Sequence, residues 1–273
     1  MTVSTTRRGR RTAAGPTQSV LAEVTQVRHL TPHMVRITVR SEDLFDFPYA
    51  GGDHWFRLFL PRPGQDRPRI PVTEDWYSEM LAMPGEQRPI LRNYTVRRFR
   101  PALGEIDIDL VRHGDTGPAT RWAGRARVGD LIGLLDQGVK YQPLEHCQWR
   151  LFLGDESALP AIGSIVEGMT DETVARVLVE VPTPDDIQDL AIPPGADVRV
   201  TWLPRSGTAA GPGDLLRAAA REVEHPDGRP YVWIAGESSM VTDLRRHFVE
   251  RGIPKDDICF SGYWRKDGPT YDD

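Results

Sequence analysis

The sequence has little of what builds disulfide frameworks, metal centres and membrane spans. Its 273 residues include two cysteines, Cys147 and Cys259, which are far apart and define neither a disulfide framework nor a metal-ligand spacing. The histidines are dispersed and show no ligand spacing either. No apolar run approaches the ~20 residues that span a bilayer. We therefore expect a protein of the reducing cytoplasm, with no resident metal and no integral membrane segment.

An excess of basic residues is also missing. The net charge of −5 argues against a nucleic-acid partner. Residues 1–17 carry four arginines and many small side chains, but no apolar signal-peptide stretch follows them. We interpret this segment as a disordered, solvated tail, with a transit peptide or a nucleic-acid arm as alternatives. The length fits one large or two modest globular domains, and we expect a monomer.

Motifs of side-chain catalysis are absent as well. The chain has no G-x-S-x-G elbow, no Ser-His-Asp order and no G-x-G-x-x-G dinucleotide fingerprint. We therefore assign no catalytic side chain and expect a bound cofactor to carry the chemistry.

The first half of the chain has the pattern of an antiparallel β-barrel. Short β-rich stretches separated by turn signals lie at 19–27, 34–40, 54–60, 92–98, 105–113 and 128–135. Such spacing predicts a closed barrel over residues 18–146. The segment between Pro61 and Pro89 is rich in proline and charge, and predicts a long excursion with a short helix at 76–83.

The second half alternates strands with helices. Apolar strands are predicted at 149–154, 175–181, 196–203 and 230–235, and helices at 158–168, 213–224 and 239–251. This alternation predicts an α/β domain with a parallel sheet over residues 147–273. The boundary between the two patterns falls near residues 143–148.

The hexapeptide Arg92-Asn-Tyr-Thr-Val-Arg97 combines two guanidinium groups, an aromatic ring and a hydroxyl on one predicted strand. Alternation places Arg92, Tyr94 and Val96 on one face, and Asn93, Thr95 and Arg97 on the other. A flat aromatic cofactor with a diphosphate tail needs such groups. The alternative is an edge strand with a solvated basic face.

A second cluster runs from His113 through two glycines to Trp122 and enters a helix at Pro118. Free N–H groups at a helix start favour a phosphate, and Thr120 adds a hydroxyl. The alternative is an ordinary capped helix with Trp122 in the core, and the sequence leaves core and ligand contact equally open for this ring. His113 could be structural or could bond a cofactor.

Two strand-to-helix turns in the second half follow predicted parallel strands, at 153–160 and 234–240. Ligands bind beyond the carboxyl ends of such strands, so the two turns could clasp one ligand. Glu180 ends another strand and could touch a ribose hydroxyl or be solvated.

Together these segments resemble the siderophore-interacting protein family, the flavin-dependent ferric-siderophore reductases of the ferredoxin–NADP reductase superfamily. The resemblance spans roughly residues 19–268 and is carried by Arg92-x-Tyr-Thr-x-Arg97, His113 with Gly117–Ala123, Gly129-Asp130, Gly154–Ala161, Trp233–Glu237 and Gly262–Arg265. It implies an N-terminal antiparallel β-barrel flavin domain followed by a C-terminal α/β parallel-sheet nicotinamide-binding domain.

The resemblance also implies site residues. FAD and NADPH or NADH would contact Arg92, Tyr94, Thr95, Val96, Arg97, His113, Gly117, Ala119, Thr120, Trp122, Gly154, Asp155, Glu156, Ser157, Ala235, Gly236 and Glu237. Basic residues near the flavin would hold an anionic ferric siderophore, namely Arg57, Arg265 and Lys266, although each could instead be a snorkelling surface residue.

The implied activity is an NAD(P)H-dependent flavoprotein oxidoreductase that reduces Fe(III)-siderophore and releases Fe(II) for iron acquisition. Without an iron–sulfur cysteine set, electrons would pass from flavin directly to substrate. The alternatives are a flavin oxidoreductase with another acceptor and a siderophore-binding protein without turnover. The choice between NADH and NADPH stays open: Arg176 and Arg205 could meet a 2′-phosphate, whereas Glu180 could favour an unphosphorylated ribose.

Overall fold

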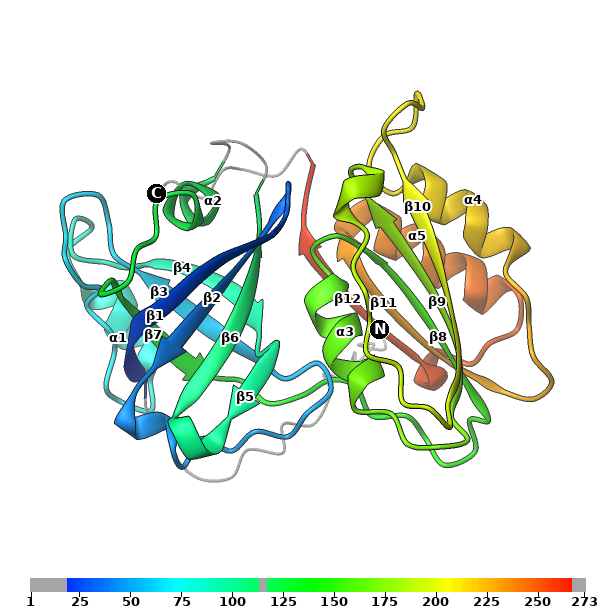
Figure 1. Cartoon of the computed structure of the whole chain (residues 1–273), viewed down its shortest axis with the longest axis horizontal. Helices are drawn as coiled ribbons and strands as arrows, with labels where there is room; N and C mark the ends of the chain where they lie inside the picture. Colours follow the sequence, from blue (N-terminus) through cyan, green and yellow to red (C-terminus); the bar gives the residue numbers. More distant parts are fainter. Residues whose placement is uncertain (1–18, 113–116, 267–273) are drawn as a thin grey trace, which may run out of the picture.

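The computed structural model describes residues 19–112 and 117–266. The predicted tail at 1–17 lies outside the described residues. The chain forms two lobes side by side, a β lobe from the first half and an α/β lobe from the second (Figure 1). Within the described ranges, no helix combines the length and apolarity needed to cross a membrane.

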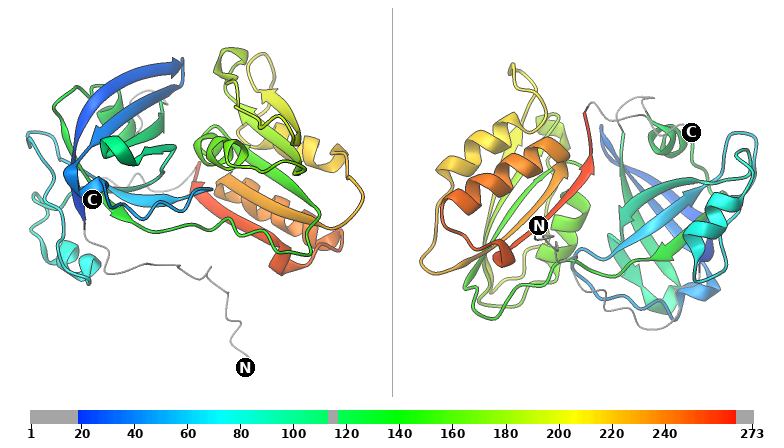
Figure 2. Two further views of the ribbon diagram at one scale, coloured as in Figure 1. Left: turned by 60° about the horizontal axis from the view of Figure 1, so that its bottom comes forward. Right: turned by 180° about the vertical axis from the view of Figure 1, so that it is seen from behind.

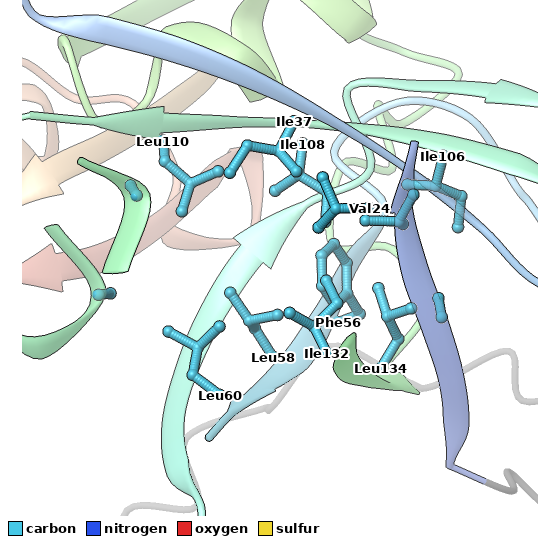
Figure 3. Close-up of a cluster of buried hydrophobic side chains, with 14 of the residues drawn as sticks. Val24, Ile37, Phe56, Leu58, Leu60, Ile106, Ile108, Leu110, Ile132 and Leu134 are labelled. Carbon is cyan, nitrogen blue, oxygen red and sulfur yellow. The ribbon is translucent and has the colours of Figure 1, made fainter. Parts of the chain in front are cut away.

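The β lobe is one antiparallel sheet. Its strands follow the order β4-β3-β7-β1-β2-β6-β5 and comprise β1 (Val20–Thr31), β2 (Met34–Arg40), β3 (Trp55–Leu60), β4 (Ile90–Thr95), β5 (Arg98–Arg100), β6 (Glu105–Val111) and β7 (Leu131–Asp136). The sheet curls until β4 contacts β6, although no hydrogen-bonded ladder joins the two edges among the described strands. The curled sheet surrounds a core of apolar side chains that come from several of its strands, among them Val24, Ile37, Phe56, Ile108 and Ile132 (Figure 3). The predicted antiparallel β-barrel is therefore present with an open seam.

The predicted strand at 92–98 is interrupted, because the chain changes partner in its middle. Residues of β4 pair with β3, and β5 pairs with β6. At the crossing, the Val96 N–H donates to the His54 carbonyl and the Arg97 N–H donates to the Asp107 carbonyl. Alternation in sequence could not show this change, since it depends on which strands lie on either side.

The excursion between β3 and β4 contains the expected helix, α1 (Trp76–Ala82), capped by Asp75. Met80 packs with Phe59 and Leu135 against the outer surface of the sheet. Gly133 makes room for this packing, because an added Cβ would collide with Ile70. The short 3-10 helices η1 (Glu42–Leu44) and η2 (Pro101–Leu103) complete the lobe.

The α/β lobe is a five-stranded parallel sheet in the order β10-β9-β8-β11-β12. Its elements are β8 (Trp149–Asp155), α3 (Leu159–Glu167), β9 (Val174–Val181), η3 (Pro184–Asp186), β10 (Asp197–Pro204), α4 (Asp214–Glu222), β11 (Pro230–Glu237), α5 (Ser238–Glu250), η4 (Lys255–Asp257) and β12 (Ile258–Trp264). Helix α3 covers the face toward the β lobe, and α4 and α5 cover the other (Figures 1 and 2). Strand β12 was not predicted, because its Ser261-Gly262 step breaks the apolar pattern.

Several polar contacts among the described residues join the lobes. The Trp233 indole N–H donates to buried Asp53 at 3.1 Å, and the guanidinium of Arg97 pairs with the Glu167 carboxylate. The His33 ring lies 2.8 Å from Asp186, and the Lys140 ammonium lies 3.0 Å from the Ser261 hydroxyl. The edge strand β12 therefore lies next to the β lobe, as the rear view shows (Figure 2).

Candidate functional site

The predicted flavin strand lies beside the predicted phosphate-binding helix. Strand β4 carries Arg92, Tyr94 and Thr95, and α2 (Pro118–Ala123) contacts β4 and β6. Burial raises the pKa of Tyr94 to about 12, although the Arg92 charge lowers it. Two segments that are separate in sequence thus meet in space, and they supply an aromatic ring, a guanidinium and a helix start.

The register of β4 against β3 separates its two faces. Arg92 lies opposite Leu58 and Tyr94 opposite Phe56, whose side chains point into the core (Figure 3). Directly opposed residues share a face. Asn93 and Thr95 therefore lie on the outer face, as the alternation in the sequence predicts.

The last two residues of the hexapeptide point away from solvent. Val96 belongs to the barrel core. The buried guanidinium of Arg97 bonds both carboxylate oxygens of Glu167 on α3, with Asp109 at 3.7 Å. The charge of Arg97 is thus engaged between the lobes, and a cofactor contact by either residue stays a prediction.

Helix α2 has two kinds of residue. Ala119 and Trp122 are buried in the barrel core, so the ring that the sequence left open lies among core side chains. Gly117 and Thr120 are half-buried, and an added Cβ on Gly117 would meet nothing within 4 Å. Open space at this helix start fits the close approach of a phosphate to the backbone. His113 lies outside the described residues.

In the α/β lobe the two predicted turns are adjacent at the carboxyl edge of the sheet. Gly154 of β8 pairs with Ala235 of β11, and the Glu237 N–H donates to Asp155 at 2.8 Å. Both glycines are tightly packed, since a Cβ on Gly154 would meet Ala158 at 2.6 Å and one on Gly236 would meet Asp155 at 2.5 Å. This packing holds the two turns, Gly154–Ser157 and Ala235–Glu237, against each other, and we call the pair the clasp.

Asp155 is the centre of that clasp. It is fully buried and accepts from the Ser157 N–H and hydroxyl, the Glu237 N–H and the Trp264 indole N–H. Burial and the charge of Glu156 raise the pKa of Asp155 to about 6, although these donors lower it. The structure thus gives this side chain a positioning task, and its predicted contact with cofactor stays untested.

The acidic groups near the clasp are paired. Arg205 binds both oxygens of Glu156 and lies 3.0 Å from Glu180, which also accepts from the Gly213 and Leu216 N–H groups. Glu180 is fully buried, so neither a solvated state nor a free ribose contact describes it. Arg205 is likewise engaged rather than open to a 2′-phosphate.

Arg176 is far from the clasp. It lies near the amino end of β9 and pairs with Asp197 and Glu224. Nucleotides bind at the opposite, carboxyl end of parallel strands. The suggestion that Arg176 meets a 2′-phosphate is therefore wrong, because strand direction carries it to the other edge.

A cationic and aromatic cluster covers the outer face of β3. The Arg57 guanidinium lies 5.1 Å from the ring centre of Trp55 and 5.5 Å from that of Trp76, and it donates to Asn93 at 2.7 Å. The Lys140 ammonium lies 4.9 Å from the Trp55 ring, over which it forms a cation–π contact. We call Trp55, Arg57, Trp76 and Lys140 the cation–aromatic cluster.

The two cations of this cluster could bind an anion. The Nε of Arg57 is buried and has no hydrogen-bond partner among the described residues. Burial also lowers the pKa of Arg57, although the neighbouring Tyr77 raises it. Sequence reasoning found Arg57 but missed Lys140 and Trp55, because Lys140 belongs to the connector between the lobes and reaches β3 only in the folded chain.

The C-terminal segment reaches the same region. Tyr263 on β12 lies close to Thr95 of β4, and its side chain is exposed. Arg265 and Lys266 follow β12 and are exposed. The end of β12 thus lies between the carboxyl edge of the parallel sheet and β4, the predicted flavin strand.

A curled antiparallel sheet beside a parallel sheet that is covered by helices on both faces defines the two-domain ferredoxin reductase fold. The ferredoxin NADP+ reductase from Neisseria gonorrhoeae shares this fold, with a TM-score of 0.62 and 17% identity over 90% of this chain and 99% of that chain.

Family models give the particular assignment. A siderophore-interacting FAD-binding domain matches residues 23–141, and a siderophore-interacting protein domain matches residues 147–267. The ferric vibriobactin reductase ViuB of Vibrio cholerae is 30% identical over 249 residues, 90% of this chain and 89% of ViuB. The crystal structure of a siderophore utilization protein from T. fusca has a TM-score of 0.81 and 35% identity, covering 94% of this chain and 97% of that chain.

The chain belongs to the siderophore-interacting protein family. This confirms the resemblance and the fold class predicted from sequence, and the first family model agrees with FAD as the flavin.

Proposed function

We propose that this protein is an FAD-dependent NAD(P)H:ferric-siderophore reductase that releases Fe(II) for iron acquisition. The observation that carries the proposal is the placement of the cation–aromatic cluster. It lies on the outer face of β3, beside Thr95 on the predicted flavin strand and next to β12 of the other lobe. An anionic chelate held there would be close to both predicted cofactor sites.

In this proposal, residues 18–146 hold FAD and residues 147–273 hold the nicotinamide nucleotide. Arg92 and the α2 start at Gly117–Thr120 bind the phosphates, and Tyr94 and Thr95 contact the flavin ring. The open space at Gly117 and the contact of α2 with β4 support this arrangement. The clasp of Gly154–Ser157 with Ala235–Glu237 holds the nucleotide at the carboxyl edge of the sheet.

The substrate is bound by charge and by aromatic contact. Arg57 and Lys140 attract the anion, and Trp55 offers a ring face for aryl groups of a catecholate. Arg265 and Lys266, exposed at the end of β12, add positive charge on the other side of the same region.

The chemistry that bound FAD would supply is the conversion of a two-electron hydride from NAD(P)H into single electrons for ferric iron. The residues of the chain contribute binding and alignment. The Asp155 clasp fixes the edge on which the nucleotide lies, the contacts of Arg97 with Glu167 and of Asp53 with Trp233 fix its distance from β4, and the cation–aromatic cluster fixes the chelate. We further propose that the enzyme is a monomer, which light scattering tests, and that it acts in the cytoplasm, which cell fractionation tests.

Reduction of ferric siderophores by the purified flavoprotein tests the proposal. With NADH or NADPH and a panel of catecholate and hydroxamate chelates, a ferrous trap should report about two ferrous ions per nucleotide oxidised. The Arg57→Ala variant should raise KM for the chelate roughly 10-fold or more without changing flavin reduction, since a lost charge-assisted contact has that scale. Arg28→Ala, exposed on β1, is the matched control and should change neither quantity.

Three other results would redirect the assignment. Absence of Fe(II) above the buffer rate contradicts ferric-siderophore reduction. Flavin bleaching by NAD(P)H without Fe(II) indicates a reductase with another acceptor. A colourless protein that binds ferric siderophore without turnover indicates a binding module.

A further inference from the structure

A cluster of three potential metal ligands lies at the edge of the α/β lobe opposite the nucleotide turns. His146 and Cys147 come just before β8, and Asp257 comes just before β12, so all three are at the amino ends of parallel strands. One imidazole nitrogen, the thiol sulfur and a carboxylate oxygen lie within 4.8 Å of one another. In residues 19–112 and 117–266, no other group of His, Cys, Asp and Glu meets this condition.

The spacing suits a small divalent ion. Bonds of about 2.0–2.3 Å to nitrogen, oxygen and sulfur place tetrahedral ligand atoms roughly 3.4–3.7 Å apart. The His146 Nε2 and the Asp257 Oδ1 are 2.9 Å apart, so an ion would replace the proton that they share and widen the pair by about 0.5 Å. The Cys147 sulfur lies within 4.8 Å of these two atoms, so it would have to move toward them by about 1 Å at most.

The surroundings already order two of the three ligands. Asp257 is fully buried, and the Arg229 guanidinium bonds its Oδ2, which leaves Oδ1 for the ion. Cys147 is buried, and its N–H donates to the Leu144 carbonyl at 2.9 Å. The His146 side chain is 47% exposed, so water can complete the coordination. An outer partner such as Arg229 on the Asp257 carboxylate orients a metal ligand.

We propose that His146, Cys147 and Asp257 form a binding site for one divalent transition metal of the zinc class. A thiolate, an imidazole and one carboxylate favour Zn(II), Co(II) or Fe(II) over Mg(II), Ca(II) or Fe(III), which prefer all-oxygen sets. The site is separate from the proposed reductase site and does not depend on that activity. Sequence spacing could not reveal it, because His146 and Asp257 are 111 residues apart.

Occupancy would join two segments that hold the lobes. His146 and Cys147 end the connector that carries Lys140, and Asp257 precedes β12, which carries Tyr263. Because such an ion binds the folded state and not the unfolded chain, its binding raises the free energy of unfolding. The Arg229 charge opposes the ion, so we expect weaker binding than at a four-ligand structural zinc site.

Cobalt titration of the full flavoprotein, kept reduced with a phosphine, tests the site. We expect saturable 1:1 binding with a thiolate-to-cobalt charge-transfer band, a dissociation constant below about 100 µM, and displacement of the band by Zn(II). Cys147→Ser should abolish the band, and His146→Ala, at an exposed position, should weaken binding at least roughly 10-fold. Cys259→Ser is the matched control and should leave the band unchanged.

Thermal unfolding gives an independent measurement. Zn(II) should raise the midpoint of the parent protein and of Cys259→Ser, but not that of Cys147→Ser. The proposal is overturned if no saturable thiolate band forms, if the band persists in Cys147→Ser, or if it is lost in Cys259→Ser instead. Each of these results can occur whether or not the protein reduces ferric siderophores.

Discussion

Arg92 is the residue on which the proposed flavin site depends most directly. It lies on β4, the strand that contacts α2, and shares a face with Tyr94. Replacement by alanine should lower FAD affinity roughly 10–100-fold, because one charge-assisted phosphate contact is lost. The absorbance ratio of flavin to protein after gel filtration measures the effect.

Arg40→Ala, exposed at the end of β2, is the control for loss of an arginine in the same lobe. The far-ultraviolet circular dichroism of both variants should match that of the parent. Full flavin occupancy in Arg92→Ala would show that β4 does not hold the phosphates.

Asp155 predicts a pH dependence of stability. Its folded pKa of about 6 is above the value of about 3.9 expected in the unfolded chain. The folded state therefore binds the proton more tightly, so this stabilisation is fully present below about pH 4 and is lost as pH rises through 6. The loss should reach roughly 3 kcal/mol of unfolding free energy.

Urea unfolding of the parent and of Asp155→Asn between pH 4 and 7 measures this contribution. The difference in unfolding free energy, parent minus variant, should fall with rising pH, because the amide cannot ionise. Asp185→Asn, at an exposed position in η3, should keep a constant difference from the parent. A constant difference for Asp155→Asn as well would contradict the raised pKa.

Among the elements, α5 shows how one predicted site residue can have a structural task. The Glu237 carboxylate accepts from the Ser239 N–H at 2.7 Å and the Met240 N–H at 2.9 Å, and so caps the helix. Burial raises the pKa of Glu237, but the bonds from Ser239 and Met240 lower it overall. Glu237→Ala should cost about 1–2 kcal/mol of unfolding free energy, the usual scale for loss of a cap.

Glu250→Ala tests the same helix at its other end. A carboxylate at a helix C-terminus is unfavourable, so this exposed substitution should be neutral or slightly stabilising. Chemical unfolding of both variants gives the comparison. Equal losses at the two ends would show that α5 does not depend on its cap.

Elements were largely predictable because each carries a periodic pattern of its own. The helices at 158–168, 213–224 and 239–251 correspond to α3, α4 and α5 within about two residues. The missed features are relations between elements. The partner change at Val96 and the addition of β12 at the sheet edge depend on neighbouring strands, which no local pattern records.

Charged site residues were less predictable, for a related reason. Arg97 and Arg205 were suggested as cofactor contacts from their positions in sequence, yet both face carboxylates from distant segments. Lys140 was missed because it is in the connector between the lobes, far in sequence from its ring partner Trp55 on β3. Sequence shows where a charge is along the chain, but the folded partner determines whether that charge is available to a ligand.

At the scale of the whole molecule, the position of one lobe against the other should set the rate of flavin reduction by NAD(P)H. The guanidinium of Arg97 packs against Gly163 of α3 and pairs with Glu167 of the same helix. A Cβ added to Gly163 would come within 3.1 Å of this guanidinium. A buried pair that loses one partner leaves an uncompensated charge. Glu167→Gln should therefore loosen α3 from the β lobe.

We expect Glu167→Gln to keep FAD bound but to slow flavin reduction by NAD(P)H at least about 10-fold, because hydride transfer is sensitive to misplacement of about 1 Å. Rapid mixing under anaerobic conditions, followed by flavin bleaching, measures the rate. Gly163→Ala should act in the same direction, since it displaces Arg97 without removing a charge. Asp189→Asn removes a carboxylate at an exposed position outside this pair and should leave the rate unchanged. If both α3 variants reduce flavin at the parent rate, the Arg97–Glu167 contact does not set the distance between the two cofactor sites. Other contacts between the lobes, such as those of Asp53 with Trp233 and of Lys140 with Ser261, must then do so.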